Sequence, residues 1–350
     1  MSDDIHIRIE GRVGRITLNR PGALNALTYA MCRAIDATLI KWAGMPEITM
    51  LVFDAKGSRA FCAGGDIARM YATGTAGDYA YGRRFWADEY RMNARLFEFP
   101  KPVASFMQGF TMGGGVGVGC HGSHRVVCES SRIAMPECGI GLVPDVGGSL
   151  ILARAPGRLG EYLGTTGTRM GPGDAILAGF ADYFIPQEAW PDVIDALIDT
   201  GDWKVIDRAA LAPPEAPLAA LQPEIDDAFA GATLRDILTV LRHTDSVFAA
   251  EAMKALARNA PLSVACAVEL VHRARMRDTI HHALTQEYRF TARSMEHGDF
   301  LEGIRAAIID KDRSPNWCHD TPEAVGPAEV SAMLLPLGAD ELTFTREGQP

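Results

Sequence analysis

The chain has 350 residues, of which 47% are hydrophobic, and its 34 Lys and Arg against 44 Asp and Glu give a net charge of −10. A chain of this length can bury one large core, or a core together with a smaller domain. The acidic balance argues against broad binding to nucleic acid or to an anionic membrane, which needs a basic face, but it allows a small phosphate-bearing ligand.

The cysteines and the first residues indicate the compartment. The seven cysteines are an odd set without a CxxC pair, which fits reduced thiols better than a disulfide scaffold. The start, MSDDIHIRIEGRVGRI, lacks the basic-then-apolar pattern of a signal peptide and the Arg-rich, acid-poor pattern of a transit peptide. No unbroken apolar run reaches the roughly 18 residues that a membrane span needs. We therefore expect a cytoplasmic protein that does not bind membranes.

The N-terminal part of the chain alternates between strand and helix patterns. Ile5, Ile7 and Ile9 alternate with polar residues before a Gly-Arg turn, which predicts a hairpin ending at Leu18. Thr28 can cap a helix whose apolar residues follow at steps of three and four. Further buried strands are predicted at 49–54, 103–107 and 124–128, and helices at 67–71 and 78–97.

Later segments become mainly helical. Residues 147–167 predict two short helices, another begins at 171, and 183–185 is predicted as a closing strand. The first ~185 residues therefore read as α/β by the alternation of elements. Helices are predicted at 187–200, 233–243, 246–258, 261–277 and 279–297, a looser connection around the prolines at 213–223, and one late strand signal at Ile308-Ile309. We expect a core of residues 1–190 holding the site and a mainly helical region of residues 191–350.

Two turns of small residues each follow a predicted buried strand. The first spans 61–66 (FCAGGD) and the second 112–115 (MGGG). Small residues leave backbone N–H groups open, and a helix that starts there adds positive potential. The first turn by itself could be an ordinary strand-to-helix connection with Asp66 as the helix cap. Together, two such turns at neighbouring strand ends could aim two N–H groups at one oxygen, which is the design of an oxyanion hole.

Two carboxyl groups lie close to the second cluster of glycines. Glu137 and Asp145 are eight residues apart, and apolar residues surround both. A carboxyl group in such surroundings tends to have a raised pKa and can act as an acid or a base. Alternatively, either group only caps a helix, and Asp145 before Val146 and Gly147 is an ordinary N-cap candidate.

Other motifs of catalysis are missing from the chain. It has no GxSxG, HExxH or P-loop motif. The string Gly117-x-Gly119-x-x-Gly122 fits a dinucleotide fingerprint but lies some ten residues past the end of the predicted strand. His121, His124 and the pair at 281–282 lack ligand spacing with cysteines or acids, so no metal site is expected.

Several motifs together resemble one family. The loop AFCAGGDI, the turn TMGGG and the following MPE resemble the crotonase (enoyl-CoA hydratase/isomerase) superfamily. MPECGIGLVPDVGG, Glu89 and the segment FLEGIRAAIIDKDRSPNW at 300–317 look like its 3-hydroxyisobutyryl-CoA hydrolase branch. The similarity runs from about Ile5 to the end of the chain. It implies an α/β fold, a crotonase-like spiral of ββα units with a helical C-terminal region, and leaves open whether the chain forms a homo-oligomer.

The resemblance also assigns a substrate and roles to single residues. It implies a small-molecule acyl-CoA substrate, with CoA as part of that substrate and no separate cofactor, and a place in valine catabolism. The backbone N–H groups of Gly65 and Gly114 would hold the thioester oxygen. Glu137 and Asp145 would be the catalytic acids. Three further residues would contact the substrate, namely Glu89 in the acyl pocket and Ala63 and Asp66 along the CoA-binding loop.

Departures from the hydratase pattern favour hydrolysis. Hydratases use two glutamates, and one of them stands three residues after the oxyanion-hole glycine of the second turn, where this chain has Gly117. Their other glutamate matches Glu137, and where they usually carry glycine this chain has Asp145. One carboxylate is lost and another gained, so thioester hydrolysis is favoured over hydration of a double bond. The alternatives are an enoyl-CoA hydratase or isomerase and a non-catalytic acyl-CoA-binding protein with the same fold.

Overall fold

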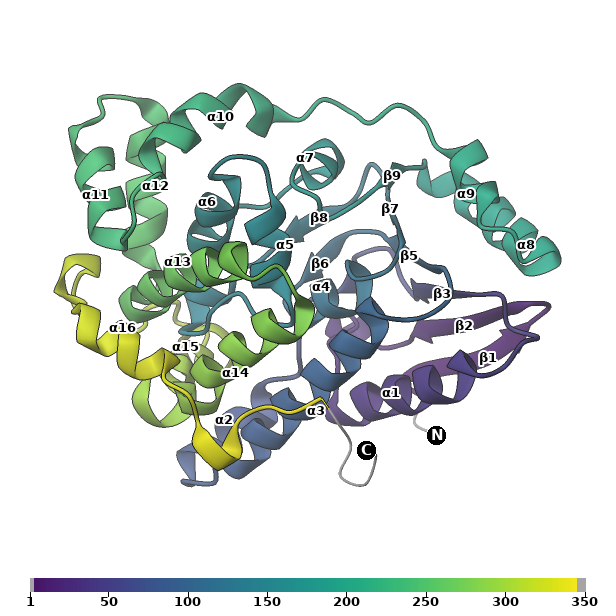
Figure 1. Cartoon of the computed structure of the whole chain (residues 1–350), viewed down its shortest axis with the longest axis horizontal. Coiled ribbons are helices and arrows are strands. Elements are labelled where there is room, and N and C mark those ends of the chain that lie inside the picture. Colours follow the sequence, from purple (N-terminus) through teal and green to yellow (C-terminus); the bar gives the residue numbers. More distant parts are fainter. Residues whose placement is uncertain (1–2, 345–350) are drawn as a thin grey trace. The chain divides into compact units, whose positions relative to one another are not determined.

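The computed structural model of the chain describes residues 3–344 (Figure 1). The chain divides into two compact units, each built from three stretches of sequence. Unit 1 comprises Met1–Asp66, Arg91–Ala134 and Arg169–Ala219, and unit 2 comprises Ile67–Tyr90, Met135–Thr168 and Ala220–Pro350. Each unit thus collects segments that are far apart in the sequence, whereas the sequence alone suggested one boundary near residue 190.

All strands of the described residues belong to unit 1 and form two sheets. The larger sheet has the order β1-β2-β3-β5-β7-β9, with β1 antiparallel to β2 and the other neighbours parallel. The smaller sheet, β4-β6-β8, is parallel throughout. From β3 to β8, consecutive strands therefore alternate between the sheets, as the predicted ββα turns require. The strands are β1 (Ile5–Glu10), β2 (Val13–Leu18), β3 (Met50–Ala55), β4 (Ala60–Cys62), β5 (Val103–Met107), β6 (Phe110–Met112), β7 (His124–Val127), β8 (Arg132–Ala134) and β9 (Tyr183–Phe184).

Helices α8 (Trp190–Thr200) and α9 (Lys204–Ala209) complete the core of unit 1. Alternate residues of the central strands share one face of a strand, so Val52 of β3 and Phe106 of β5 enter the same buried cluster as residues of these two helices. Trp190 joins that cluster, and its ring meets the ring of Phe106 edge-on at 5.3 Å. Helices α1 (Tyr29–Ala43), α4 (Gly114–Gly119) and α7 (Pro172–Leu177) also belong to unit 1.

Helices make up the regular structure of unit 2. They are α2 (Ala68–Thr75), α5 (Gly148–Arg154), α6 (Leu159–Thr166), α11 (Leu234–His243), α12 (Val247–Arg258), α13 (Pro261–Met276), α14 (Ile280–His297), α15 (Phe300–Ile304) and α16 (Pro327–Leu334). Two more helices, α3 (Ala80–Phe97) and α10 (Pro217–Ala228), contribute residues to both units. After β9 the described chain contains helices and no strand, which confirms the predicted helical C-terminal region.

Most predicted elements are confirmed. They include the hairpin, the buried strands and the helix capped by Thr28, whose side chain accepts a hydrogen bond from the N–H of Met31. The strands β4, β6 and β8 were missed because three residues are too few to show a period.

Two predictions for the later chain were wrong. Ile308 and Ile309 form no strand but end a π-helical segment, η4 (Arg305–Ile309). The expected loose connection contains α10, whose first residue is Pro217 and whose interior holds Pro223. Proline is accepted in the first turn of a helix because the N–H that it lacks would have no partner there.

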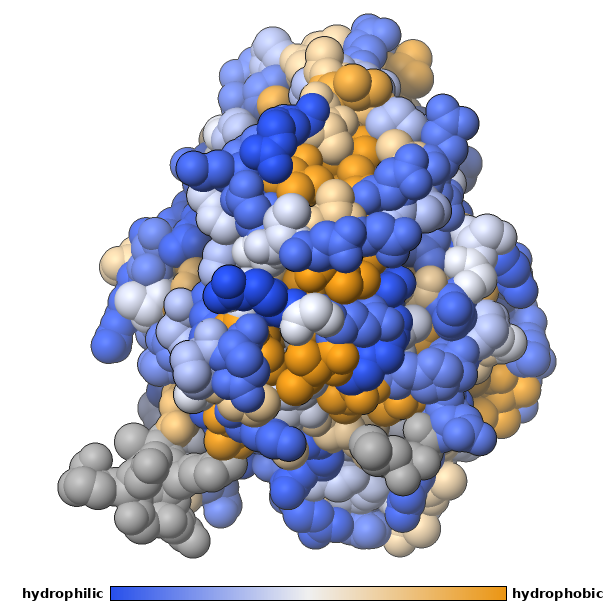
Figure 2. Space-filling model, turned by 90° about the vertical axis from the view of Figure 1, so that its right-hand side faces the viewer, coloured by the Kyte–Doolittle hydropathy of each residue, from blue (hydrophilic) through white to orange (hydrophobic). Residues whose placement is uncertain are grey.

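The surface also bears on the membrane prediction. No helix among residues 3–344 is both long and apolar enough to span a membrane. The face in Figure 2 carries hydrophobic residues in patches that hydrophilic residues border. Scattered patches are usual because apolar atoms contribute more than half of a folded protein's accessible surface.

The close approach of two chain segments at Gly115 yields a prediction about stability. A Cβ atom on Gly115 would lie 2.0 Å from the carbonyl oxygen of Cys62, so Gly115→Ala must push backbone apart. We expect a loss of roughly 1–3 kcal/mol in the free energy of unfolding, measured by urea denaturation. Gly44→Ala is the control, since no atom lies within 4 Å of its added Cβ. Equal stability of Gly115→Ala and the unsubstituted protein would contradict the packing described for this turn.

Candidate active site

The two glycine turns predicted from the sequence lie at neighbouring strand ends in unit 1. The first follows β4 and the second follows β6, and these strands pair in parallel. Gly64 and Gly113 have φ values of 117° and 50°, a region that glycine adopts at little cost. The turns also touch, since Gly115 packs directly against the backbone of Cys62. Both turns therefore depend on glycine at these positions.

The residues after those two glycines, Gly65 and Gly114, carry the two backbone N–H groups predicted to form an oxyanion hole. Leu27 lies beside the first turn, where its N–H donates to the carbonyl of Gly64 at 2.8 Å and its carbonyl accepts from Asp66 at 2.9 Å, which bypasses the N–H of Gly65. Gly114 is the first residue of α4, and an N–H at that position has no partner inside the helix. Within residues 3–344, neither N–H donates a recorded hydrogen bond. Both can receive an external acceptor such as a carbonyl oxygen.

The remaining residues predicted along the first turn have partners of their own. The N–H of Ala63 donates to the carbonyl of Leu24 at 3.0 Å. The carboxylate of Asp66 accepts from the guanidinium of Arg20 at 3.1 Å and is half-buried. Asp66 does not cap α2, whose N-cap is Ile67 and which has no side-chain cap, so that alternative was wrong. The ion pair instead ties the first turn to the segment after β2.

Four of the buried carboxyl groups of unit 2 interact with one another. They are Glu89 on α3, Glu137 at the start of the 3₁₀ turn η2 (Glu137–Ile140), Asp145 before α5, and Glu287 on α14. Each exposes 4% or less of its surface. The charge of Asp145 raises the pKa of each of the other three, which places all four in one electrostatic cluster. Glu137 and Asp145 were expected from the sequence pattern and Glu89 from the family resemblance, whereas Glu287 was not predicted.

Tyr90 is the direct partner of Asp145. Its hydroxyl donates to Oδ2 of Asp145 at 2.7 Å and lies 3.4 Å from the hydroxyl of Thr291 on α14. Burial raises the pKa of Asp145 to about 7, while the hydrogen bond from Tyr90 opposes that rise by stabilising the ionised form. Tyr90 was missed, although it follows Glu89 directly in the DEY sequence.

Glu89 and Glu137 differ from Asp145 in the protonation state that their surroundings favour. Burial, reinforced by the charge of Asp145, raises the pKa of both groups well above the usual range for glutamate. One carboxyl oxygen of each has no hydrogen-bond partner among the described residues. The hydrogen bond from Tyr90 therefore favours the ionised form of Asp145, whereas burial and the charge of Asp145 favour the protonated form of Glu137. Two carboxyl groups whose surroundings separate their pKa values can serve as base and acid.

The turn that carries Asp145 is strained. Val146 and Gly147 have φ values of 54° and 81°, and the N–H of Gly148 closes the turn onto the carbonyl of Asp145 at 2.7 Å. A residue with a side chain costs roughly 1–2 kcal/mol in this left-handed region, and a β-branched residue such as Val146 is rare there. Asp145 does not cap α5, whose N-cap is Gly147, so the capping alternative was wrong here too.

Glu287 supplies what a helix cap would otherwise provide. Its Oε2 accepts from the N–H of Gly147 at 2.8 Å, and its Oε1 accepts from the N–H of Ser149 at 3.0 Å and from the hydroxyl of the same serine. Burial raises the pKa of Glu287 to about 8, and these hydrogen bonds oppose the rise. The carboxylate that holds this turn thus lies 140 residues further along the chain than Gly147.

The other motifs of the sequence do not form sites. Gly117 and Gly119 lie inside α4 rather than at a strand-to-helix turn, which removes the basis for a dinucleotide fingerprint. Among the described residues no group of three or more His, Cys, Asp or Glu could hold a metal ion.

Comparison with known proteins decides the family. The sequence matches the enoyl-CoA hydratase/isomerase family over residues 13–334. The chain belongs to this family. A protein of Danio rerio named 3-hydroxyisobutyryl-CoA hydrolase, mitochondrial, is 37% identical over 95% of this chain and 89% of its own length. The Homo sapiens protein of the same name is 33% identical over 98% of this chain and 91% of its own length. The resemblance drawn from the motifs is therefore confirmed.

Solved structures confirm the crotonase-like fold of this enoyl-CoA hydratase/isomerase family member. A crystal structure described as an enoyl-CoA hydratase from Rhodobacter sphaeroides 2.4.1 matches with a TM-score of 0.93 and 58% identity, over 97% of this chain and all of the other. One described as a carnitinyl-CoA dehydratase from Mycobacterium thermoresistibile matches with a TM-score of 0.93 and 40% identity, over 99% of this chain and all of the other. These relatives are named for different reactions, namely hydrolysis, hydration and dehydration.

The hydrogen bond between Tyr90 and Asp145 yields a prediction for this family member. Tyr90→Phe removes a donor to the ionised carboxyl group, so the pKa of Asp145 should rise above its value of about 7. Carboxyl ¹³C NMR of protein labelled at aspartate, with the signal assigned by Asp145→Asn, measures this pKa. Tyr162→Phe is the control, because the hydroxyl of Tyr162 bonds Thr168 instead. An unchanged or lower pKa in Tyr90→Phe would show that the bond does not form.

Proposed function

We propose that this protein hydrolyses a short-chain 3-hydroxyacyl-CoA thioester, with 3-hydroxyisobutyryl-CoA as the expected substrate, to the free acid and CoA. The observation that carries the proposal is the buried acid pair, in which Tyr90 donates to Asp145 at 2.7 Å and burial raises the pKa of Asp145 to about 7 and the pKa of Glu137 well above its usual range. Relatives at 37% and 33% identity that are named for this hydrolysis support it.

The proposed mechanism uses Asp145 as base and Glu137 as acid. The N–H groups of Gly65 and Gly114 bind the thioester oxygen and stabilise the negative charge that it gains. Ionised Asp145 takes a proton from a water molecule as the water oxygen bonds to the thioester carbon. The carbon–sulfur bond then breaks, and Glu137 protonates the departing CoA thiolate. Glu89 lines the acyl group in this proposal, and Ala63 and Asp66 lie along CoA.

A covalent variant of the mechanism is also open to this chain. In it, Glu137 attacks the thioester carbon, CoA leaves, and water cleaves the resulting mixed anhydride. Such an attack needs ionised Glu137, and burial beside the charge of Asp145 raises the pKa of Glu137 and so disfavours the ionised form. The electrostatics therefore favour direct attack by water.

Hydration of an enoyl-CoA is the second candidate, because the structure described as an enoyl-CoA hydratase is 58% identical to this chain. A residue of α4 argues against it. The position three residues after Gly114 is Gly117, which has no side chain to act on water. Asp145 supplies a carboxylate elsewhere, in a form that ionises near neutral pH. The chain thus lacks the hydratase glutamate at position 117 and carries a carboxyl group at Asp145 instead, and both differences favour hydrolysis.

The proposed steps require neither a metal nor a redox cofactor, since CoA enters as part of the substrate. They also run within one chain, so a homo-oligomer stays a prediction. With 3-hydroxyisobutyryl-CoA as substrate, the reaction would belong to valine catabolism. A cytoplasmic location stays the prediction from the N-terminal sequence, whereas the names of the relatives place those proteins in mitochondria.

A thiol-release assay tests the proposed function. We expect free CoA from 3-hydroxyisobutyryl-CoA and neither thiol release nor hydration with crotonyl-CoA. Asp145→Asn and Glu137→Gln should each lower kcat by about 10²-fold or more with little change in substrate binding, because acid and base catalysis each contribute about 10²–10⁴-fold.

Asp174→Asn is the matched control, since Asp174 is also buried but accepts from the backbone of Leu218 in unit 1. It should retain the kcat of the unsubstituted protein. Hydration of crotonyl-CoA without thiol release would select the hydratase alternative. Full turnover by Asp145→Asn would remove the main support for the hydrolase.

A further inference from the structure

A buried carboxylate that the proposed mechanism does not use holds the turn next to Asp145. Glu287 is fully buried. It receives three hydrogen bonds from two residues of that turn, namely the N–H groups of Gly147 and Ser149 and the hydroxyl of Ser149. Three donors from a single short segment, all directed at one carboxylate, fix the path of the backbone there.

The same helix, α14, also contacts the hydrogen-bond partner of the Asp145 side chain. Thr291 follows Glu287 by one helical turn on α14, and its hydroxyl contacts Tyr90, the donor to the Asp145 carboxyl group. One face of α14 thus acts on Asp145 in two ways. Glu287 binds the backbone that follows Asp145, and Thr291 contacts Tyr90, which donates to the Asp145 carboxyl group. A strained turn such as that at Val146 persists only where its surroundings fix it.

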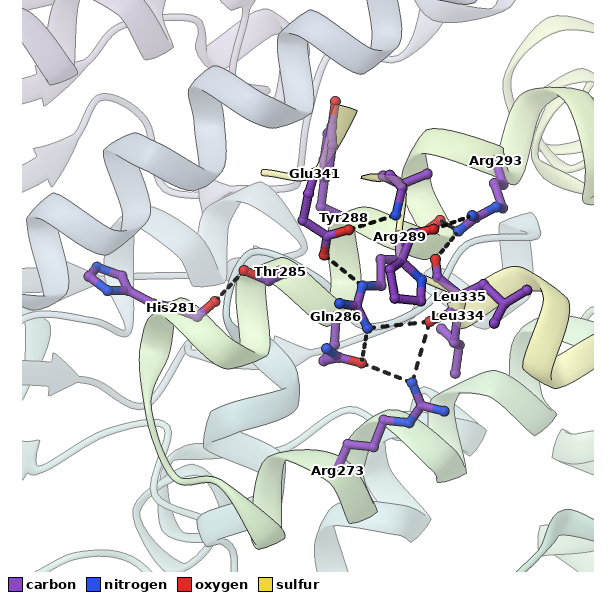
Figure 3. A network of polar contacts seen from close by, with 12 residues as sticks. Arg273, His281, Thr285, Gln286, Tyr288, Arg289, Arg293, Leu334, Leu335 and Glu341 are labelled. Atoms are coloured by element: carbon purple, nitrogen blue, oxygen red, sulfur yellow. Dashed lines mark hydrogen bonds and ion pairs between the residues drawn. The ribbon is translucent and has the colours of Figure 1, made fainter. Parts of the chain in front are cut away.

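The opposite face of α14 is itself anchored within unit 2. Figure 3 shows Gln286 accepting from Arg273 of α13 and from Arg289 of α14, at 2.9 and 3.2 Å. Arg289 also pairs with Glu341 at 2.7 Å, and Arg293 donates to the carbonyl of Leu335 at 2.7 Å. These contacts fasten α14 to α13 and to the segment that follows α16. The helix can therefore serve as a fixed support.

We propose that Glu287 is the positioning residue for Asp145, because it holds the strained turn 145–149 in the one conformation that presents the Asp145 carboxylate to the substrate. This inference rests on the proposed function. In the proposed mechanism, Glu287 touches neither the substrate nor the reacting atoms, and it acts only through Asp145. The carboxyl group is required because both of its oxygens accept hydrogen bonds, whereas glutamine would place an amide N–H₂ against a backbone N–H donor.

Kinetics of Glu287→Gln tests the proposal. We expect kcat to fall about 100-fold, because a displacement of about 1 Å at a reacting group can cost that factor, while KM changes by less than about threefold. In the Asp145→Asn background the same substitution should cost nothing further, because Glu287 acts through the residue already removed. Faster amide hydrogen exchange at 147–149 in Glu287→Gln should report the loosened turn directly.

Glu161→Gln is the matched control. Glu161 is another fully buried glutamate of unit 2, paired with Arg275 at 2.8 Å and Arg158 at 3.0 Å. Its replacement should lower the unfolding temperature and leave kcat per folded molecule unchanged. A role of Glu287 in stability alone predicts the same behaviour for Glu287→Gln, and that result would overturn the proposal. The proposal would also be overturned if Glu287→Gln lowered kcat by the same factor in the unsubstituted protein and in the Asp145→Asn background.

Two further measurements separate the possible failures. If Glu287→Gln does not fold, Ser149→Ala removes one of the three donors, and we expect a several-fold loss of kcat at unchanged KM. An unchanged kcat in that variant would contradict the proposal. If the unsubstituted protein releases no thiol, the proposed function fails. Unchanged amide hydrogen exchange at 147–149 in Glu287→Gln would reject the positioning role of Glu287 independently of that result. If thiol is released and Asp145→Asn is inactive but Glu287→Gln is fully active, only this inference fails.

Discussion

The burial of one interacting cluster of four carboxyl groups in unit 2 is the constraint on which the proposed acid and base chemistry depends. Glu89, Glu137, Asp145 and Glu287 are almost completely removed from solvent, and like charges so placed cannot all ionise near neutral pH. The groups must therefore divide between protonated and ionised forms. Hydrogen bonds influence the division, because the donor from Tyr90 opposes the rise in the pKa of Asp145, whereas Glu89 and Glu137 each keep an oxygen without a partner among the described residues. Acid and base chemistry follows from that inequality.

Within unit 1, the two glycine turns present backbone donors rather than reactive side chains. Parallel pairing of β4 and β6 brings two turns to one edge of the small sheet, where the N–H groups after Gly64 and Gly113 have no hydrogen-bond acceptor among residues 3–344. Backbone donors of this kind are fixed by the fold and need no reorganisation when charge develops on a bound oxygen. The close contact at Gly115 shows that the turns tolerate little change of shape.

The sequence revealed these features unequally. Glycine turns are local, so the two turns with open backbone N–H groups could be predicted from composition and position alone, whereas the positive φ values at Gly64 and Gly113 came from the structure. Glu137 and Asp145 stood out by their apolar neighbours, while Glu89 was identified only through resemblance to the family. Glu287 could not be predicted, because nothing near it in the sequence indicates a partner 140 residues away. The β-branched pair at Ile308 suggested a strand, but it lies in a helical segment, where tertiary context overrode local preference.

The pH dependence of kcat/KM for 3-hydroxyisobutyryl-CoA tests the account most directly, because this ratio reports the ionisation of the free enzyme. Asp145 must be ionised to accept a proton, and its pKa is about 7, so activity should rise with pH to a midpoint near that value. It should fall again at alkaline pH, where Glu137 loses the proton that the leaving group needs. Activity that is already maximal at about pH 5 would mean a catalytic carboxyl group with the ordinary pKa of about 4, and would contradict the account.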